Sequence, residues 1–155
     1  MINQLITAQN GTGKTTLITG IIASYALDLY AVVRSIVLID RGADYSQLSQ
    51  KLPNVTCIEL TPENDALDCQ LNEDTNCLII NYPLDNSNDD EFNRQVLKLL
   101  SSNPERSCVV NEAWSFNKEF LKTIASHASG YVMATSEHVN IGEIPFSIHV
   151  NMARH

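Results

Sequence analysis

The segment Ala8–Thr15 (AQNGTGKT) contains residues whose types and spacing are suited to binding phosphate. It fits the pattern G-x-x-x-x-G-K-[ST], with alanine at the first glycine position. Glycines in such a loop let backbone N–H groups approach phosphate oxygens, the lysine contacts the β- and γ-phosphates, and the hydroxyl binds Mg²⁺. We therefore expect ATP with Mg²⁺ to bind at the residues of this loop, which are Asn10, Gly11, Thr12, Gly13, Lys14, Thr15 and Thr16. Lys14 is also expected to take part in catalysis, and Thr15 to be a metal ligand.

Two elements flank this loop and would position it. Ile2–Thr7 is a short apolar run that predicts a strand, and Thr15–Leu29 has the composition of a helix. The positive end of that helix dipole would face the phosphates. Strand, glycine-rich loop and helix follow one another in the order that a phosphate site requires.

The rest of the chain alternates between strand-like and helix-like runs. The strand-like runs are apolar without alternation, which is typical of strands buried on both faces of a parallel sheet. We predict one α/β domain over residues 1–155, with a mainly parallel central sheet between layers of helices. The expected strands are 35–40, 55–60, 76–81, 107–111, 130–135 and 147–152, the expected helices are 45–51, 92–101 and 115–127, and 61–75 is an expected loop.

Composition narrows the classes of function. Of the 155 residues, 44% are hydrophobic and 18% are charged, as in ordinary globular domains. The net charge of −8 and the scattered basic residues argue against direct DNA binding by the monomer, and no run predicts membrane insertion. The start of the chain does not resemble a signal peptide, and the four cysteines lack C-x-x-C spacing, so we expect buried thiols and a cytoplasmic location. The histidines lack zinc-ligand spacing.

Polar residues at the strand ends are the further candidates, because ligands of parallel sheets bind beyond the carboxyl ends of the strands. An acid at such an end holds Mg²⁺ through water, and a second acid polarises the attacking water. Glu112 is the expected base. Two metal ligands stay open: Asn111, a neutral residue in the position of the usual acid, and Asp40, a true carboxylate at the end of the run 35–40.

Three segments resemble the ATPases of conjugative transfer and type IV secretion, members of the HerA–FtsK group. Residues 111–114 (NEAW) resemble the D-E-A-W signature, and 40–48 (DRGADYSQL) resemble the D-x-G-x-x-Y-x-x-L segment. Residues 131–136 (YVMATS) resemble a strand that ends in A-T-Q, whose glutamine senses the γ-phosphate. All three follow the phosphate loop in the order of that family.

The resemblance implies a three-layer, RecA-like P-loop NTPase that hydrolyses ATP in conjugative DNA transfer, secretion or assembly. It implies a homo-oligomer, or a protein partner in a larger apparatus. The chain departs from the family where Asn111 replaces the Walker B acid and where Ser136 replaces the sensing glutamine. These departures indicate either slow hydrolysis or a degenerate nucleotide-binding module without turnover.

A second resemblance is to partition-type ATPases. Residues 78–83 (LIINYP) have the form of that group's I-D-x-P strand, with Asn81 in place of the aspartate. Gln9 occupies the position of the group's signature lysine. This alternative would place the metal site near Asn81.

Two arginines are candidates for an arginine finger, which would enter the site of a neighbouring subunit. Arg41 and Arg154 each follow a strand-like run, so they should lie at the nucleotide edge of the sheet. Trp114 also follows a strand, and we interpret it as a packing residue rather than a base-stacking one. The acidic run 85–91 is interpreted as a solvated turn before a helix.

Overall fold

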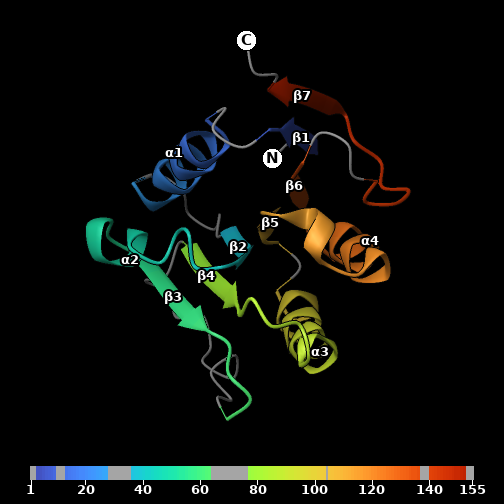
Figure 1. Ribbon diagram of the computed structural model, residues 1–155. Helices are drawn as coiled ribbons and strands as arrows, with labels where there is room; N and C mark the ends of the chain where they lie inside the picture. The colour runs from blue at the N-terminus through green and yellow to red at the C-terminus, as the bar shows by residue number, and fades with distance from the viewer. Residues whose placement is uncertain are drawn as a thin grey trace.

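The computed structural model describes residues 3–9, 13–27, 36–63, 77–103, 105–136 and 140–152. Within these ranges one seven-stranded sheet runs in the order β3-β4-β2-β5-β6-β1-β7, and every pairing is parallel (Figure 1). The strands are β1 (Gln4–Ala8), β2 (Ile36–Arg41), β3 (Val55–Glu59), β4 (Cys77–Tyr82), β5 (Ser107–Val110), β6 (Gly130–Thr135) and β7 (Ile148–Met152). The helices are α1 (Lys14–Ala26), α2 (Leu48–Lys51), α3 (Asp89–Ser101) and α4 (Lys118–His127), with a 3₁₀ turn η2 (Ala113–Ser115).

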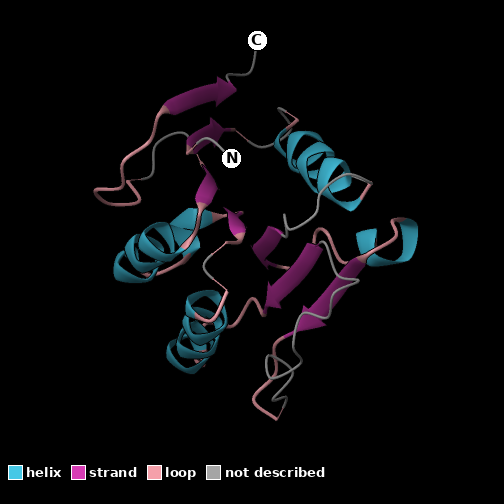
Figure 2. Ribbon diagram, turned by 180° about the vertical axis from the view of Figure 1, so that it is seen from behind, coloured by secondary structure: helices cyan, strands magenta, loops and turns pink. Residues whose placement is uncertain are grey.

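Helices cover both faces of the sheet, which gives the three layers that the sequence predicts (Figures 1 and 2). On one face, Ile18 and Ile22 of α1 pack in a cluster with Leu38 of β2. On the other face, a second cluster contains Phe92 of α3 and Leu121 of α4. Because both faces are covered, the central strands β2 and β4 are buried along their whole length.

The two edge strands differ from the buried runs that were expected. β7 is largely exposed, and β3 alternates between exposed positions and positions that are buried or partly buried. Each has only one neighbouring strand in the described sheet, so one of its backbone edges is unpaired there.

All four described helices differ from prediction at a boundary. α1 is Lys14–Ala26 rather than 15–29, and the other three differ for local reasons. α3 begins at Asp89 rather than residue 92, because the acidic residues of the predicted turn form its first turn, where they favour the helix dipole. α4 begins later than residue 115, because η2 intervenes and the Asn117 side chain caps the helix by accepting bonds from Glu119 N and Phe120 N. Only 48–51 of the predicted helix 45–51 is helical, after a turn. Most of the predicted loop 61–75 lies outside the described residues.

The cysteines agree with the prediction where the structure describes them. Cys77 and Cys108 are buried free thiols, and Cys57 is a partly buried one. Cys69 lies outside the described residues. None of the helices in the described ranges has the length and apolar character needed to cross a lipid bilayer.

Candidate functional site

The phosphate-loop motif stands between β1 and α1, as predicted. Gly13 has φ of 93°, a left-handed conformation that glycine adopts without strain, and the helix begins at the next residue, Lys14. Lys14 is buried, whereas Thr15 and Thr16 in the first helical turn are exposed. Asn10, Gly11 and Thr12 lie outside the described residues.

The structure brings together two predicted site residues that are far apart in the sequence. Lys14 Nζ lies 2.6 Å from Glu112 Oε1, and the side chains are 10% and 25% exposed. The other oxygen of Glu112 accepts a 2.5 Å hydrogen bond from the indole N–H of Trp114. The expected phosphate-binding lysine and the expected base therefore form an ion pair at the carboxyl edge of the sheet.

Glu112 has a backbone conformation that is rare for a residue with a side chain. Its φ of 53° and ψ of 47° are left-handed, which costs about 1–2 kcal/mol. Ser115 supports this turn, because both its backbone N–H and its hydroxyl donate to the Glu112 carbonyl, at 2.9 and 2.7 Å. Such strain persists only where the surrounding structure fixes it, and it is typical of functional positions.

The two metal-ligand candidates are direct neighbours, because β2 and β5 are adjacent in the sheet. Asn111 Nδ2 donates to Asp40 Oδ1 at 2.8 Å, and the backbone N–H of Asp44 donates to Asp40 Oδ2 at 3.1 Å. Asp40 is fully buried. Burial raises its pKa to about 6, and the Asn111 hydrogen bond opposes this shift only in part.

Buried oxygen atoms without a hydrogen-bond partner lie around these residues. Within the described part of the chain they include Tyr45 Oη and Asn111 Oδ1, in side chains that are each 1% exposed. Leaving a buried polar group unpaired costs about 1–3 kcal/mol, so unpaired oxygens beside a buried carboxylate are unusual. Together with the Asp40 carboxylate they fit hydrated Mg²⁺, which prefers oxygen ligands and retains several waters.

The strand order explains why these groups converge. β6 lies between β1 and β5, and β2 lies on the other side of β5. Thr135 is paired in register with Thr7 of β1, so it ends β6 between the phosphate-loop strand and Glu112. Ser136, the predicted sensor, follows directly and is partly buried.

Arg41 does not occupy the position that an arginine finger requires. Its guanidinium is buried and makes five hydrogen bonds within its own chain, with the Asp89 carboxylate, the Pro83 carbonyl and both Ser115 oxygens as acceptors. It also stacks over the Phe116 ring, 4.7 Å from its centroid. All five donors of the guanidinium are thus committed. Arg154, the other candidate, lies outside the described residues.

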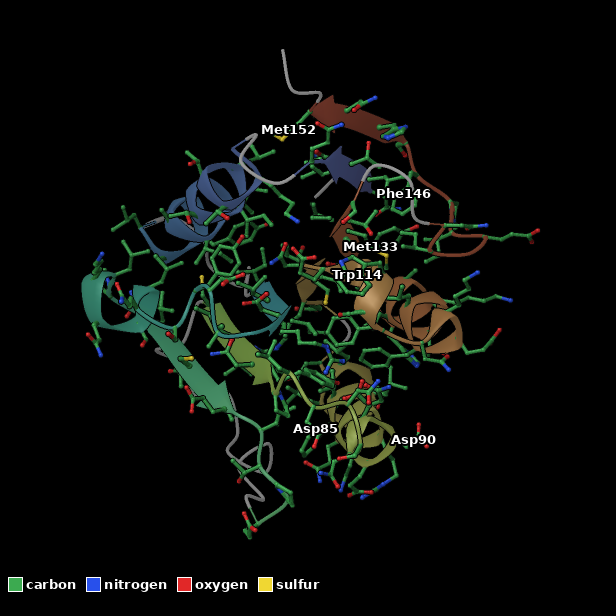
Figure 3. All side chains as sticks on the ribbon, viewed as in Figure 1. Asp85, Asp90, Trp114, Met133, Phe146 and Met152 are labelled. Atoms are coloured by element: carbon green, nitrogen blue, oxygen red, sulfur yellow. The ribbon has the colours of Figure 1, made fainter. Side chains whose placement is uncertain are left out.

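The interpretation of Trp114 as a packing residue is wrong. Its side chain is 50% exposed, near the centre of the view in Figure 3 and away from Asp85 and Asp90 at the α3 end. Since its indole N–H binds Glu112, the aromatic ring lies beside the candidate site.

Sequence reasoning missed Tyr45. It stands in a segment that was singled out, but the signal there was only a match of residue type. Its burial without a partner became evident only in three dimensions.

No three side chains of His, Cys, Asp or Glu in the described ranges form a metal cage. Comparison of the sequence with models of protein families and with curated proteins finds no match to either.

Proposed function

We propose that this chain is a RecA-like P-loop NTPase domain that binds ATP with Mg²⁺ and hydrolyses it slowly. The main observation behind the proposal is the ion pair between Lys14 and Glu112, whose side-chain atoms are 2.6 Å apart. Lys14 is the first residue of the helix that follows the glycine-rich loop. The motif supplies the phosphate-binding backbone, and the unpaired oxygens around Asp40 supply the setting for a hydrated cation.

Each residue has a defined role in this proposal. Lys14 leaves Glu112 to contact the β- and γ-phosphates, which frees the Glu112 carboxylate to accept a proton from the attacking water. The Thr15 hydroxyl binds the metal, while Asp40 and Asn111 orient its waters. Mg²⁺, when bound, neutralises charge on the phosphates.

Nucleotide binding is tested by thermal unfolding with and without Mg²⁺-ATP. At a hundred times the dissociation constant, a ligand adds about 2.7 kcal/mol, or roughly 5–10 °C for a domain of this size. The Lys14→Ala variant should lose this ligand-induced rise, whereas Lys122→Ala, which removes an exposed lysine from α4, should keep it. Absence of a rise in the wild-type protein at millimolar Mg²⁺-ATP would refute the proposal.

The second candidate function is a nucleotide-binding module without turnover. It is favoured by Asn111, whose amide donates to Asp40 and carries no charge for Mg²⁺. Single-turnover hydrolysis of labelled ATP distinguishes the two functions. A slow rate that Glu112→Gln abolishes supports the enzyme, and equal rates with and without protein support the module.

The partition-type alternative has less support. Asn81 is on β4, which is four strands from β1 in the sheet order. At about 4.8 Å per strand, this separates it from the phosphate loop by roughly 19 Å along the sheet. A metal ligand must lie beside Thr15, and Asp40 and Asn111 are on nearer strands.

Conjugative transfer, secretion or assembly is the work that we propose for this ATPase, on the strength of the motif resemblance. A homo-oligomer or protein partner would supply an arginine, which adds about 10³–10⁵ to such rates. Because Arg41 is committed within its own chain, Arg154 is the remaining predicted candidate. Specific activity should rise with protein concentration, and Arg154→Ala should remove the rise. Activity that is independent of concentration would contradict a shared site.

A further inference from the structure

Tyr45 is the buried residue near Asp40 to which the proposed function assigns no individual role. It lies in the turn between β2 and α2, and its ring packs in the core cluster on the α1 face of the sheet. The side chain is 1% exposed, and its hydroxyl has no hydrogen-bond partner in the described residues. A phenylalanine would fill the same core without an unpaired polar atom, so packing alone does not explain a tyrosine here.

The surroundings of this hydroxyl are those of the candidate metal site. Burial raises the pKa of Tyr45, the Thr15 hydroxyl lowers it, and the carboxylates of Asp40, Asp44 and Glu112 raise it further. The Thr15 hydroxyl is close enough to lower the pKa of Tyr45 by hydrogen bonding, although the two oxygens do not reach full hydrogen-bond geometry. Tyr45 shares its core cluster with Ile18, one turn after Thr15 on α1, and with Leu38, two residues before Asp40 on β2. The neutral phenol, which can both donate and accept, thus lies near the expected metal ligand and near acidic groups.

We propose, on the basis of the nucleotide-binding function above, that Tyr45 is a positioning residue for hydrated Mg²⁺. Its hydroxyl hydrogen-bonds a water of the cation's hydration shell, beside the waters that Asp40 and Asn111 orient. Mg²⁺ dehydrates reluctantly, so contacts to its waters contribute to binding as direct ligands do. The rigid, buried ring fixes the place of this contact before the cation arrives.

The test uses Tyr45→Phe, which removes only the hydroxyl. Tyr82→Phe is the matched control, since Tyr82 is equally buried but its hydroxyl donates to Asn93 Oδ1 at 2.8 Å on the other face of the sheet. The affinity for a non-hydrolysable ATP analogue is measured in EDTA and over a series of Mg²⁺ concentrations. In parallel, thermal unfolding is measured without ligand.

We expect the affinities in EDTA to be alike for wild type and Tyr45→Phe. Mg²⁺ should strengthen binding about five- to tenfold less in Tyr45→Phe, the size of one lost hydrogen bond. Tyr82→Phe should retain the wild-type response to Mg²⁺. Without ligand, Tyr45→Phe should melt no lower than wild type.

Two results would overturn the role of Tyr45 while leaving the proposed function intact. One is an unchanged Mg²⁺ response in Tyr45→Phe, and the other is a lowered melting temperature, which would show that the hydroxyl already has a structural partner. If wild type does not bind the analogue in EDTA or in Mg²⁺, the proposed function fails, and the role of Tyr45 fails with it.

Discussion

Asp40 and Arg41 are consecutive residues at the end of β2, and their side chains enter opposite faces of the sheet. On the face covered by α3 and α4, every N–H group of the Arg41 guanidinium donates a hydrogen bond, and the Asp89 carboxylate accepts two of these bonds. On the same face the Tyr82 hydroxyl donates to Asn93. We call these four residues, with Ser115, the Arg41 network.

The face covered by α1 has a different character. Asp40 is bonded to Asn111, but Asn111 Oδ1 and the Tyr45 hydroxyl lack partners in the described ranges. We call these three residues the Asp40 cluster. A satisfied network stabilises the protein by itself, whereas an unsatisfied cluster lowers stability until a ligand completes it. The comparison therefore separates polar groups that are satisfied within the protein from the unsatisfied groups to which the proposed function assigns metal binding.

Loss of Arg41 should give the largest effect. Arg41→Ala removes a buried ion pair with Asp89 and the contact with the Phe116 ring, so we expect the free energy of unfolding to fall by about 3–5 kcal/mol. Urea denaturation measures this. Arg94→Ala breaks the exposed ion pair with Glu91 and should leave stability nearly unchanged. If Arg41→Ala and Arg94→Ala lost equal stability, the Arg41 network would contribute no more than an exposed ion pair.

Asn111→Asp should destabilise the Asp40 cluster in the absence of metal. The new carboxylate would take the place of an amide that lies 2.8 Å from Asp40, and one acid of such a pair must stay protonated. We expect a loss of about 2–3 kcal/mol at pH 7, with Mg²⁺-ATP restoring more stability than in wild type.

Asn151→Asp, on the exposed edge strand β7, is the control for added charge. It should change neither stability nor the response to Mg²⁺-ATP. A metal-free Asn111→Asp protein as stable as wild type would show that the cluster tolerates a second acid without a ligand.

The sequence predicted much of the fold because its signals are local. The apolar runs marked the central strands, and the glycine-rich motif placed the start of α1. Glu112 and Lys14 were both predicted site residues, since one follows a strand and the other ends a motif. Their ion pair confirms only that the two are close together.

The contacts between strands could not be predicted in the same way. Nothing in the order of residues says that β2 lies between β4 and β5, so the bond between Asp40 and Asn111 was not foreseen. Arg41 was assigned to the nucleotide edge by its position after a strand, but the alternation of side chains turns it towards α3 and α4. Tyr45 was missed because burial without a partner is a property of the folded state.

Asp40 should make stability depend on pH in the direction opposite to most carboxylates. Its pKa is about 6 in the folded protein and 3.8 as a free side chain, so the folded state holds the proton more tightly. This stabilisation is present below about pH 4 and is lost as pH rises through 6, by about 3 kcal/mol in total. Wild type should lose most of that amount relative to Asp40→Asn between pH 4 and 7, measured by urea denaturation.

The titration of other acids does not affect the difference between wild type and Asp40→Asn. Hydrogen bonds from the Ser87 backbone lower the pKa of Asp85, and those from Arg94 lower that of Glu91 to about 2, so both favour stability at higher pH. They titrate alike in wild type and in Asp40→Asn, and the difference between the two proteins isolates Asp40. Parallel pH profiles would mean that Asp40 is solvated in the free protein.

Removing the two buried tyrosine hydroxyls should give the smallest changes in stability, and it tests the comparison most directly. Tyr82→Phe should lower the free energy of unfolding by about 1 kcal/mol, because it leaves Asn93 without its donor. A double-mutant cycle of Tyr82→Phe with Asn93→Ala should show a coupling of similar size. Tyr45→Phe should cost nothing in the metal-free protein, since its hydroxyl is unpaired there. If Tyr45→Phe and Tyr82→Phe lowered the free energy of unfolding equally, the Tyr45 hydroxyl would have a hydrogen-bond partner in the metal-free protein. The Asp40 cluster would then have a structural role.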